Sequence, residues 1–206
     1  MNQDLETKKI TKTKLELRGN DFKIKAPVTG SVILNNSVVV GFGDGSMRFF
    51  YQNQEPLEIK AHKGVILTMS SNGQFIYTGG DDGRFLKISS NGQISEIYNF
   101  GSQWVDCVAS TENYFACSSG KKAYLWSNNN NKPLIMDNSS TVGGLCFDLN
   151  GNKLAVASYG GVTVWQKGDR KWKSSRFVWK GSHGKVTFSP DGKYLVSAMQ
   201  ENEVHG

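Results

Sequence analysis

Short apolar stretches alternate with turn residues along most of the chain. Five of these stretches are tipped by small residues and span 38–40, 76–78, 114–116, 154–156 and 195–197. They are rich in β-branched and aromatic residues and are too short for helices, so they predict β-strands.

Two kinds of turn flank each of these strands. The first kind contains Asn35-Asn36, Asn72-Gly73, Asn150-Gly151 or Asp191-Gly192. These dipeptides tolerate a positive φ angle and predict tight hairpins. Residues 110–113 replace this signal in the third copy. The second kind contains Asp44-Gly45, Asp82-Gly83, Gly120-Lys121 or Gly160-Gly161.

A third strand follows each second turn and ends on a large apolar residue. These ends are Phe50, Ile88, Trp126 and Trp165, at spacings of 38, 38 and 39 residues. Weaker outer strands follow at 57–59, 94–97, 134–136 and 177–179. A period near 40 residues with four antiparallel strands in each copy predicts the blades of a β-propeller.

The repeat resembles the WD40 family. The resemblance rests on the turn at 189–193, the turn at 79–83, His62 before the second copy, and Trp126 and Trp165 at two strand ends. It covers residues 26–206 and implies an all-β propeller of WD40 type. The stretch 179–202 further resembles bacterial WD40 proteins of undefined biochemical role.

The resemblance also implies a hydrogen-bonded network of a His, a Ser or Thr, an Asp and a Trp within one blade. The second copy supplies His62, Thr78 and Asp82 but has Ile88 at the Trp position. No copy completes the set, so we expect apolar packing to replace part of the network.

The spacing divides the chain into a disordered polar N-terminus (1–12), an N-terminal strand able to close a ring (13–25) and the repeat array (26–206). The five units span 26–60, 61–99, 100–137, 138–180 and 181–206, and the fifth is incomplete. We expect four complete blades plus a partial fifth, a C-terminally truncated chain in an open arc, and self-association through its open sheet edges.

The apolar runs and the cysteines of the sequence predict the cellular compartment. The chain lacks an N-terminal apolar run of signal-peptide length and a stretch of 18 consecutive apolar residues, and its three cysteines lie among apolar strand residues. These features predict a cytoplasmic protein without a membrane association and with reduced, buried thiols. We expect no metal and no cofactor.

The net charge of +6 is concentrated in one segment. Residues 165–185 contain seven lysines and arginines, one acid and interleaved aromatic residues. This combination suits nucleic-acid binding through Lys167, Arg170, Lys171, Trp172, Lys173 and Arg176. The alternative is a solvated loop and an edge strand whose aromatic residues pack inward.

A second candidate surface lies on the opposite side, where the second turns and the connections between blades should gather. Its candidate partner-binding residues are His62, Lys63, Asp81, Arg84, Trp104, Tyr159 and His183. Exposed aromatic residues among mixed charges can anchor a protein partner. The structural alternative is that His62 serves its blade and that Trp104 begins a strand.

No nucleophile elbow, phosphate loop or paired-carboxylate motif is visible in the sequence. The leading hypothesis is therefore a non-catalytic protein-protein interaction scaffold with no enzyme activity. The alternatives are a nucleic-acid-binding surface at 167–185 and a propeller-type hydrolase.

Overall fold

The computed structural model describes residues 13–14, 17–19, 22–52 and 54–200. In this part of the chain all regular structure is β-strand, arranged as four four-stranded antiparallel sheets. Among the described residues no helix is long and apolar enough to cross a membrane. The predicted polar segment 1–12 lies outside the described residues.

The first three sheets each use four consecutive strands in chain order. The first contains β1 (Val28–Leu34), β2 (Ser37–Phe42), β3 (Ser46–Phe50) and β4 (Leu57–Lys60). The second contains β5 (Ile66–Ser71), β6 (Phe75–Gly80), β7 (Arg84–Ser89) and β8 (Ile94–Asn99). The third contains β9 (Cys107–Ser110), β10 (Tyr114–Ser119), β11 (Lys122–Ser127) and β12 (Asn130–Asp137). All the strands predicted for these units are present.

The fourth sheet has two long strands that each combine two predicted ones. It contains β13 (Val142–Phe147), β14 (Lys153–Lys167), β15 (Trp172–Phe188) and β16 (Leu195–Gln200). The amide of Lys167 donates to the carbonyl of Asn152 at 2.8 Å, so the two ends of β14 lie side by side. Strand β14 thus folds back near Gly160 and supplies the second and third strands of the fourth unit.

Strand β15 joins the fourth unit to the fifth. Its first part, from Trp172 to Val178, pairs with β14, and Ser182 also pairs with Tyr159 of β14. Its last part, from Ser182 to Phe188, pairs with β16. The last part of β15 and β16 are therefore the first two strands of the incomplete fifth unit. The prediction of four blades plus a partial fifth is confirmed.

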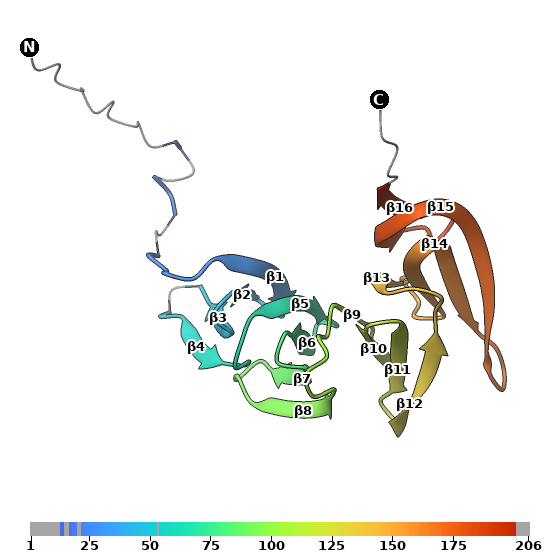
Figure 1. The fold of residues 1–206 in the computed structure, drawn as a ribbon. Helices are drawn as coiled ribbons and strands as arrows, with labels where there is room; N and C mark the ends of the chain where they lie inside the picture. Colours follow the sequence, from blue (N-terminus) through green and yellow to red (C-terminus); the bar gives the residue numbers. More distant parts are fainter. Residues whose placement is uncertain (1–12, 15–16, 20–21, 53, 201–206) are drawn as a thin grey trace, which may run out of the picture.

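The sheets follow one another along an open arc, with the first and the last at its two ends (Figure 1). The apolar cores lie between neighbouring sheets. One cluster joins Leu34 and Phe49 of the first sheet to Ile76 of the second, and another joins Phe85 of the second to Trp126 of the third. Each sheet is therefore stabilised by its neighbours, as expected of a repeat array.

The turn dipeptides adopt the predicted backbone conformation. Asn35 has a φ of 52°, and Gly73, Gly151 and Gly192 have φ values of 86°, 68° and 69°. In the third unit the Thr111 hydroxyl oxygen instead accepts the amide of Tyr114 at 3.1 Å. A side-chain hydrogen bond replaces the positive φ angle at this turn.

The described residues of 13–25 form turns and irregular structure rather than a strand. The amide of Leu17 donates to the carbonyl of Thr13 at 3.1 Å, and the ring of Phe22 lies 5.1 Å from that of Phe50. Closure of a ring by this segment stays a prediction.

Candidate partner-binding face and basic hairpin

The connections between sheets and the second turns meet at one end of the array, which we call the loop face. It comprises residues 43–45, 61–65, 81–83, 100–106, 120–121, 138–141 and 159–160. Backbone bonds hold it together: the amide of His62 donates to Gly45, that of Val105 to Gly80 and that of Val142 to Gly120. The predicted gathering of these segments at one end is therefore present.

His62 is the structural centre of the loop face in the second sheet. Its side chain is buried, with Nδ1 at 2.8 Å from Asp82 Oδ1 and Nε2 at 2.9 Å from Thr78 Oγ1. Burial lowers the pKa of His62, which favours the neutral ring. In this state Nδ1–H donates to the carboxylate, and Nε2 accepts from the threonine hydroxyl.

Asp82 fixes the surrounding backbone. Its carboxylate accepts the amides of Lys63 at 2.9 Å and Arg84 at 3.2 Å. Burial raises the pKa of Asp82, but the hydrogen bonds from His62 and from these amides outweigh it, and the net shift is downward. The Arg84 guanidinium pairs with Glu96 at 2.6 Å, so Asp82 and Arg84 both hold the second turn in place.

The predicted contact residues differ widely in accessibility. Trp104 and Tyr159 are 58% and 56% exposed, and Lys63 is exposed as well. Trp104 lies in the loop before β9 rather than in the strand. The Oδ1 atom of half-buried Asp81 has no hydrogen-bond partner among the described residues. Of the predicted contact residues, Lys63, Trp104 and Tyr159 are therefore the exposed ones, whereas Asp81 is half-buried.

The two histidines predicted on this face are not free. His62 is 1% exposed and His183 is 6% exposed. His183 Nε2 donates to the carbonyl of Trp179 at 3.1 Å, and Nδ1 lies 2.8 Å from Ser197 Oγ. Burial favours the structural alternative for His62, and the same observation gives His183 a structural role in the fifth unit.

The basic stretch forms a hairpin at the end opposite the loop face. The backbone contact between Lys167 and Asn152 places it beside the first turn of the fourth unit. Trp172 packs edge-on against Tyr114 of the third sheet at 5.4 Å, and Lys167 Nζ lies 5.3 Å from the same ring. Tyr114 and Trp172 line part of a pocket of about 520 Å³, together with Arg170 and Lys171.

The rest of the stretch is split between the two faces of the sheet. Lys173 is exposed, and Arg176 bonds to the Thr163 hydroxyl at 3.3 Å and the Tyr159 carbonyl at 3.2 Å. Phe177 and Trp179 are 60% and 66% exposed. Inward packing of the aromatic residues is correct for Trp172 and wrong for Phe177 and Trp179.

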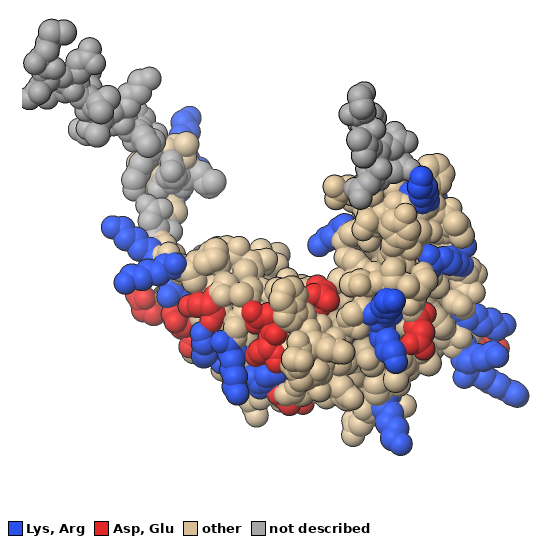
Figure 2. Space-filling model, viewed as in Figure 1, with Lys and Arg blue, Asp and Glu red and all other residues tan. Residues whose placement is uncertain are grey.

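Charge is unevenly distributed over the array. On the face visible in Figure 2, basic side chains dominate the last sheet, whereas acidic ones gather over the first two sheets. No group of three or more His, Cys, Asp or Glu residues in the described part of the chain is arranged to hold a metal ion. Cys107 and Cys117 are buried, and burial raises the pKa of both thiols.

Ser197 is a structural residue that the sequence interpretation missed. It lies six positions after Asp191, as Thr78 lies six positions after Asn72, and each bonds to a histidine. The repeat spacing contained this signal. The sequence pattern indicated only the threonine because the spacing differs: His62 lies 16 residues before Thr78, whereas His183 lies 14 residues before Ser197.

Comparison with known proteins supports the architecture. The family model described as "WD domain, G-beta repeat" matches residues 54–86, which include His62, Thr78 and Asp82. No curated protein sequence matches the chain.

Solved structures with a similar fold include a chain of the mitotic checkpoint complex, with 14% identity, a TM-score of 0.70, and coverage of 84% of this chain and 60% of that one. U3-55K and the RRP9 WD40 repeats each have 17% identity, a TM-score of 0.70, and coverage of 87% of this chain and 62% of theirs. The chain thus spans about three fifths of the length of these structures. Residues 54–86 thus match the model of a WD40 repeat, and the chain has the fold of WD40-type β-propellers.

Proposed function

We propose that this chain is a non-catalytic protein-interaction module that binds a protein partner through its loop face. Propellers of this type are typical scaffolds for protein interactions, and a rigid array of sheets presents loops in fixed positions. One neighbour is a chain of an assembly, the mitotic checkpoint complex. A protein-interaction module is the kind of protein that such an assembly contains, but we do not assign any member of that complex as the partner of this chain.

The observation that carries the proposal is the exposure of two large aromatic side chains on the loop face. Trp104 and Tyr159 are each more than half exposed, although the backbone at or next to each of them is hydrogen-bonded. The amide of Tyr159 donates to Ser140 Oγ at 2.8 Å, and the amide of Val105, next to Trp104, donates to Gly80. Exposed aromatic residues are frequent anchors in protein interfaces.

The neighbouring charges add specificity. Lys63 extends from the loop that Asp82 holds, while Arg84 is paired with Glu96 and bonds to the carbonyl of Ala61 at 3.2 Å. A partner therefore meets an exposed lysine and two exposed aromatic side chains, beside Asp82 and Arg84, which are already hydrogen-bonded within the chain. This arrangement favours a partner with a mixed apolar and acidic contact surface.

The test uses affinity capture with quantitative mass spectrometry on the whole chain. Trp104→Ser combined with Tyr159→Ser should remove the captured partners, whereas Ile33→Ser, on the exposed side of β1, should retain them. Circular dichroism checks that all variants fold equally. Retention of the same partners by the double variant contradicts binding through the loop face.

The basic hairpin supports a second candidate function, the binding of single-stranded nucleic acid. The observation in its favour is the pocket where Tyr114 and Trp172 meet and where Lys167, Arg170 and Lys171 lie nearby. Aromatic faces stack on bases, and basic side chains contact phosphates. Filter binding to single-stranded RNA should show a steep salt dependence that Arg170→Gln with Lys171→Gln reduces.

A further inference from the structure

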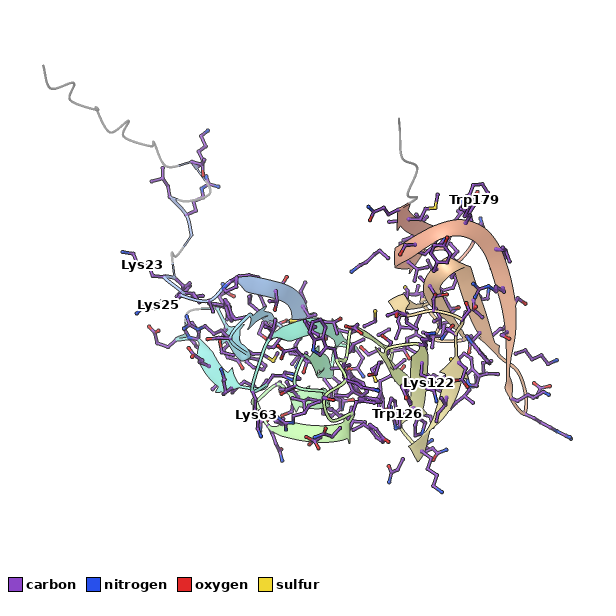
Figure 3. All side chains as sticks on the ribbon, viewed as in Figure 1. Lys23, Lys25, Lys63, Lys122, Trp126 and Trp179 are labelled. Atoms are coloured by element: carbon purple, nitrogen blue, oxygen red, sulfur yellow. The ribbon has the colours of Figure 1, made fainter. Side chains whose placement is uncertain are left out.

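The pocket of about 520 Å³ beside the basic hairpin lies between the third sheet and the fourth, and we call it the intersheet pocket. Its walls come from β10, β11, β12 and the hairpin between β14 and β15, and none of them belongs to the fifth unit. Figure 3 shows the third sheet, labelled at Lys122 and Trp126, beside this hairpin. Tyr114, Leu125 and Trp172 of the pocket also belong to the apolar cluster that joins the two sheets, so packing fixes this wall.

The charged residues that line the intersheet pocket are all basic. They are Lys132 of β12 and Arg170 and Lys171 of the hairpin. All three are exposed, and none of their side chains forms an ion pair or a hydrogen bond with another residue in the described part of the chain. Unpaired cations around one cavity attract an anion, so the pocket favours an anionic ligand.

The remaining lining residues suit a flat ring with polar edges. Trp172 is half-buried and Leu134 is 40% exposed, so both offer apolar surface to a ligand. Asn130 uses its Oδ1 atom to accept the amide of Lys132 at 3.0 Å, which leaves its Nδ2 donors available. The Ser127 hydroxyl forms no hydrogen bond with another described residue. A nucleobase matches this combination, because its face stacks on aromatic side chains and its edge forms hydrogen bonds.

The basic residues farther along β15 do not extend the intersheet pocket into a track for a strand. Side chains alternate between the two faces of a sheet, so Lys173 points away from the face on which Trp172 lines the pocket. The Arg176 guanidinium is engaged by the Thr163 hydroxyl and the Tyr159 carbonyl. The free cations are therefore gathered at one place, which suits one nucleotide better than a run of them.

The number of free cations also bears on the kind of phosphate. A phosphodiester inside a strand carries about one negative charge, whereas a terminal phosphate monoester carries about 1.5 to 2 at pH 7. Charge-assisted hydrogen bonds from lysine and arginine are strongest when the acceptor carries more charge and more free oxygens. Lys132, Arg170 and Lys171 together therefore match a terminal phosphate better than a diester.

We propose that the intersheet pocket binds a single nucleotide with a terminal phosphate. Its base contacts Trp172 and Leu134, and its phosphate is held by Lys132, Arg170 and Lys171. The hairpin is shared with the second candidate function, so the proposal rests on that function and narrows its ligand from single-stranded nucleic acid to one nucleotide. A free nucleotide and a phosphorylated strand end both present this chemistry.

The first test measures nucleotide binding to the whole chain by isothermal titration calorimetry. ADP should bind at least about tenfold more tightly than adenosine, because adenosine lacks the phosphates that the three cations contact. ADP should also bind at least about fivefold more tightly than inorganic diphosphate, because diphosphate lacks the base that stacks on Trp172. These comparisons use no variant, so they do not depend on how a substitution affects folding.

Two lysine variants of the third sheet locate the site. Lys132→Gln should weaken ADP binding by about tenfold, and Lys132 lies outside the basic stretch 165–185, so it tests the pocket rather than the stretch. Lys122→Gln is the matched control and should bind ADP as the wild type does. Lys122 begins β11, whereas Ser127 of the pocket ends it, so the two lie at opposite ends of the strand. Circular dichroism checks that both variants fold.

Short oligonucleotides identify the source of the nucleotide. Tetraadenylate with a phosphate at its 5′ or 3′ end should displace ADP at a concentration at least about tenfold lower than tetraadenylate with hydroxyl groups at both ends. Tighter binding of a phosphorylated tetraadenylate than of ADP identifies a strand end as the ligand. The reverse order identifies a free nucleotide.

Four outcomes overturn the proposal. These are equal binding of ADP and adenosine, unchanged ADP binding by Lys132→Gln, equal binding of tetraadenylate with and without a terminal phosphate, and tighter binding of a peptide of alternating glutamate and leucine than of ADP. The last outcome identifies an acidic protein segment as the occupant.

The proposal and the functions proposed above fail separately. Salt-dependent RNA binding without a preference for a terminal phosphate retains the second candidate function and rejects only the nucleotide pocket. ADP binding without any RNA binding has the opposite meaning. Trp104→Ser with Tyr159→Ser changes the loop face and should leave ADP binding intact.

Discussion

The second sheet and the fifth unit carry similar sequence motifs but differ in how they are stabilised. In the second sheet, His62 bonds to Thr78 and Asp82, and the strands pack against sheets on both sides. In the fifth unit, His183 bonds to Ser197, yet Tyr194 remains 67% exposed. A repeat motif therefore specifies the hairpin, whereas neighbouring sheets determine how stable it is.

Two tryptophans give the largest expected contrast. Trp126 is 2% exposed and stacks on Phe115 at 5.9 Å, whereas Trp179 is 66% exposed. Trp126→Ala should reduce the free energy of unfolding by about 3–5 kcal/mol because it leaves a cavity between two sheets. Trp179→Ala should change it by less than about 0.5 kcal/mol. Urea unfolding followed by circular dichroism measures both, and equal losses would refute the comparison.

Two turn glycines give the next contrast. Gly83 has a φ of 75°, and a Cβ there would overlap the carbonyl oxygen of Gly101, whereas Gly192 has a φ of 69° with open space around it. Gly83→Ala should cost about 3 kcal/mol from steric overlap and backbone strain. Gly192→Ala should cost about 1 kcal/mol from strain alone. Thermal unfolding measures the melting temperatures of the two variants. A larger decrease for Gly192→Ala than for Gly83→Ala would contradict the comparison.

Removing one residue from the hydrogen-bonded network of each histidine, His62 or His183, should give a smaller difference in the free energy of unfolding. Asp82→Ala leaves His62 Nδ1 and the amides of Lys63 and Arg84 without their acceptor, so a loss of about 2 kcal/mol is expected. Ser197→Ala removes one partner of His183 and should cost about 1 kcal/mol. Chemical unfolding at neutral pH compares them. A larger loss for Ser197→Ala would place the more important network in the fifth unit.

The smallest effect concerns pH and His62. Burial holds the folded-state pKa of His62 below its ordinary value of 6.5, so the unfolded chain binds a proton more readily between the two values. The stabilisation is complete above pH 6.5 and decreases as the pH falls toward the folded-state pKa. The melting temperature should therefore decline below pH 6.5, and His62→Gln should flatten this decline. An identical pH profile in the variant would exclude His62 as its origin.

The sequence predicted the strands well because their signals are local. Alternation and turn dipeptides placed Val39, Tyr77 and Leu154 in strands, and all three are fully buried. The fusion of predicted strands into β14 and β15 was not foreseen. Gly160 and Gly161 look like an ordinary turn in sequence, but here the backbone pairs with β15 on both sides of the fold-back.

The candidate sites were harder to predict than the fold. The sequence placed His62 and Trp104 on the same face, and they do lie among the same loops, but the histidine is buried and the tryptophan is exposed. Histidine and tryptophan can each be either a buried structural residue or an exposed contact residue. The outcome depends on whether a hydrogen-bonding partner such as Thr78 or a neighbouring sheet covers the side chain, which involves residues distant in sequence.

The sequence alone determined the repeat, its period and the hairpins of each unit, because alternation and turn chemistry act over a few residues. The tertiary structure decided which apolar faces are covered. Phe85 is buried because a third sheet packs against it, whereas Phe177 is exposed because no further sheet packs against it in the described part of the chain. Whether a strand residue is buried depends on the packing of neighbouring sheets, and the local sequence pattern does not specify this packing.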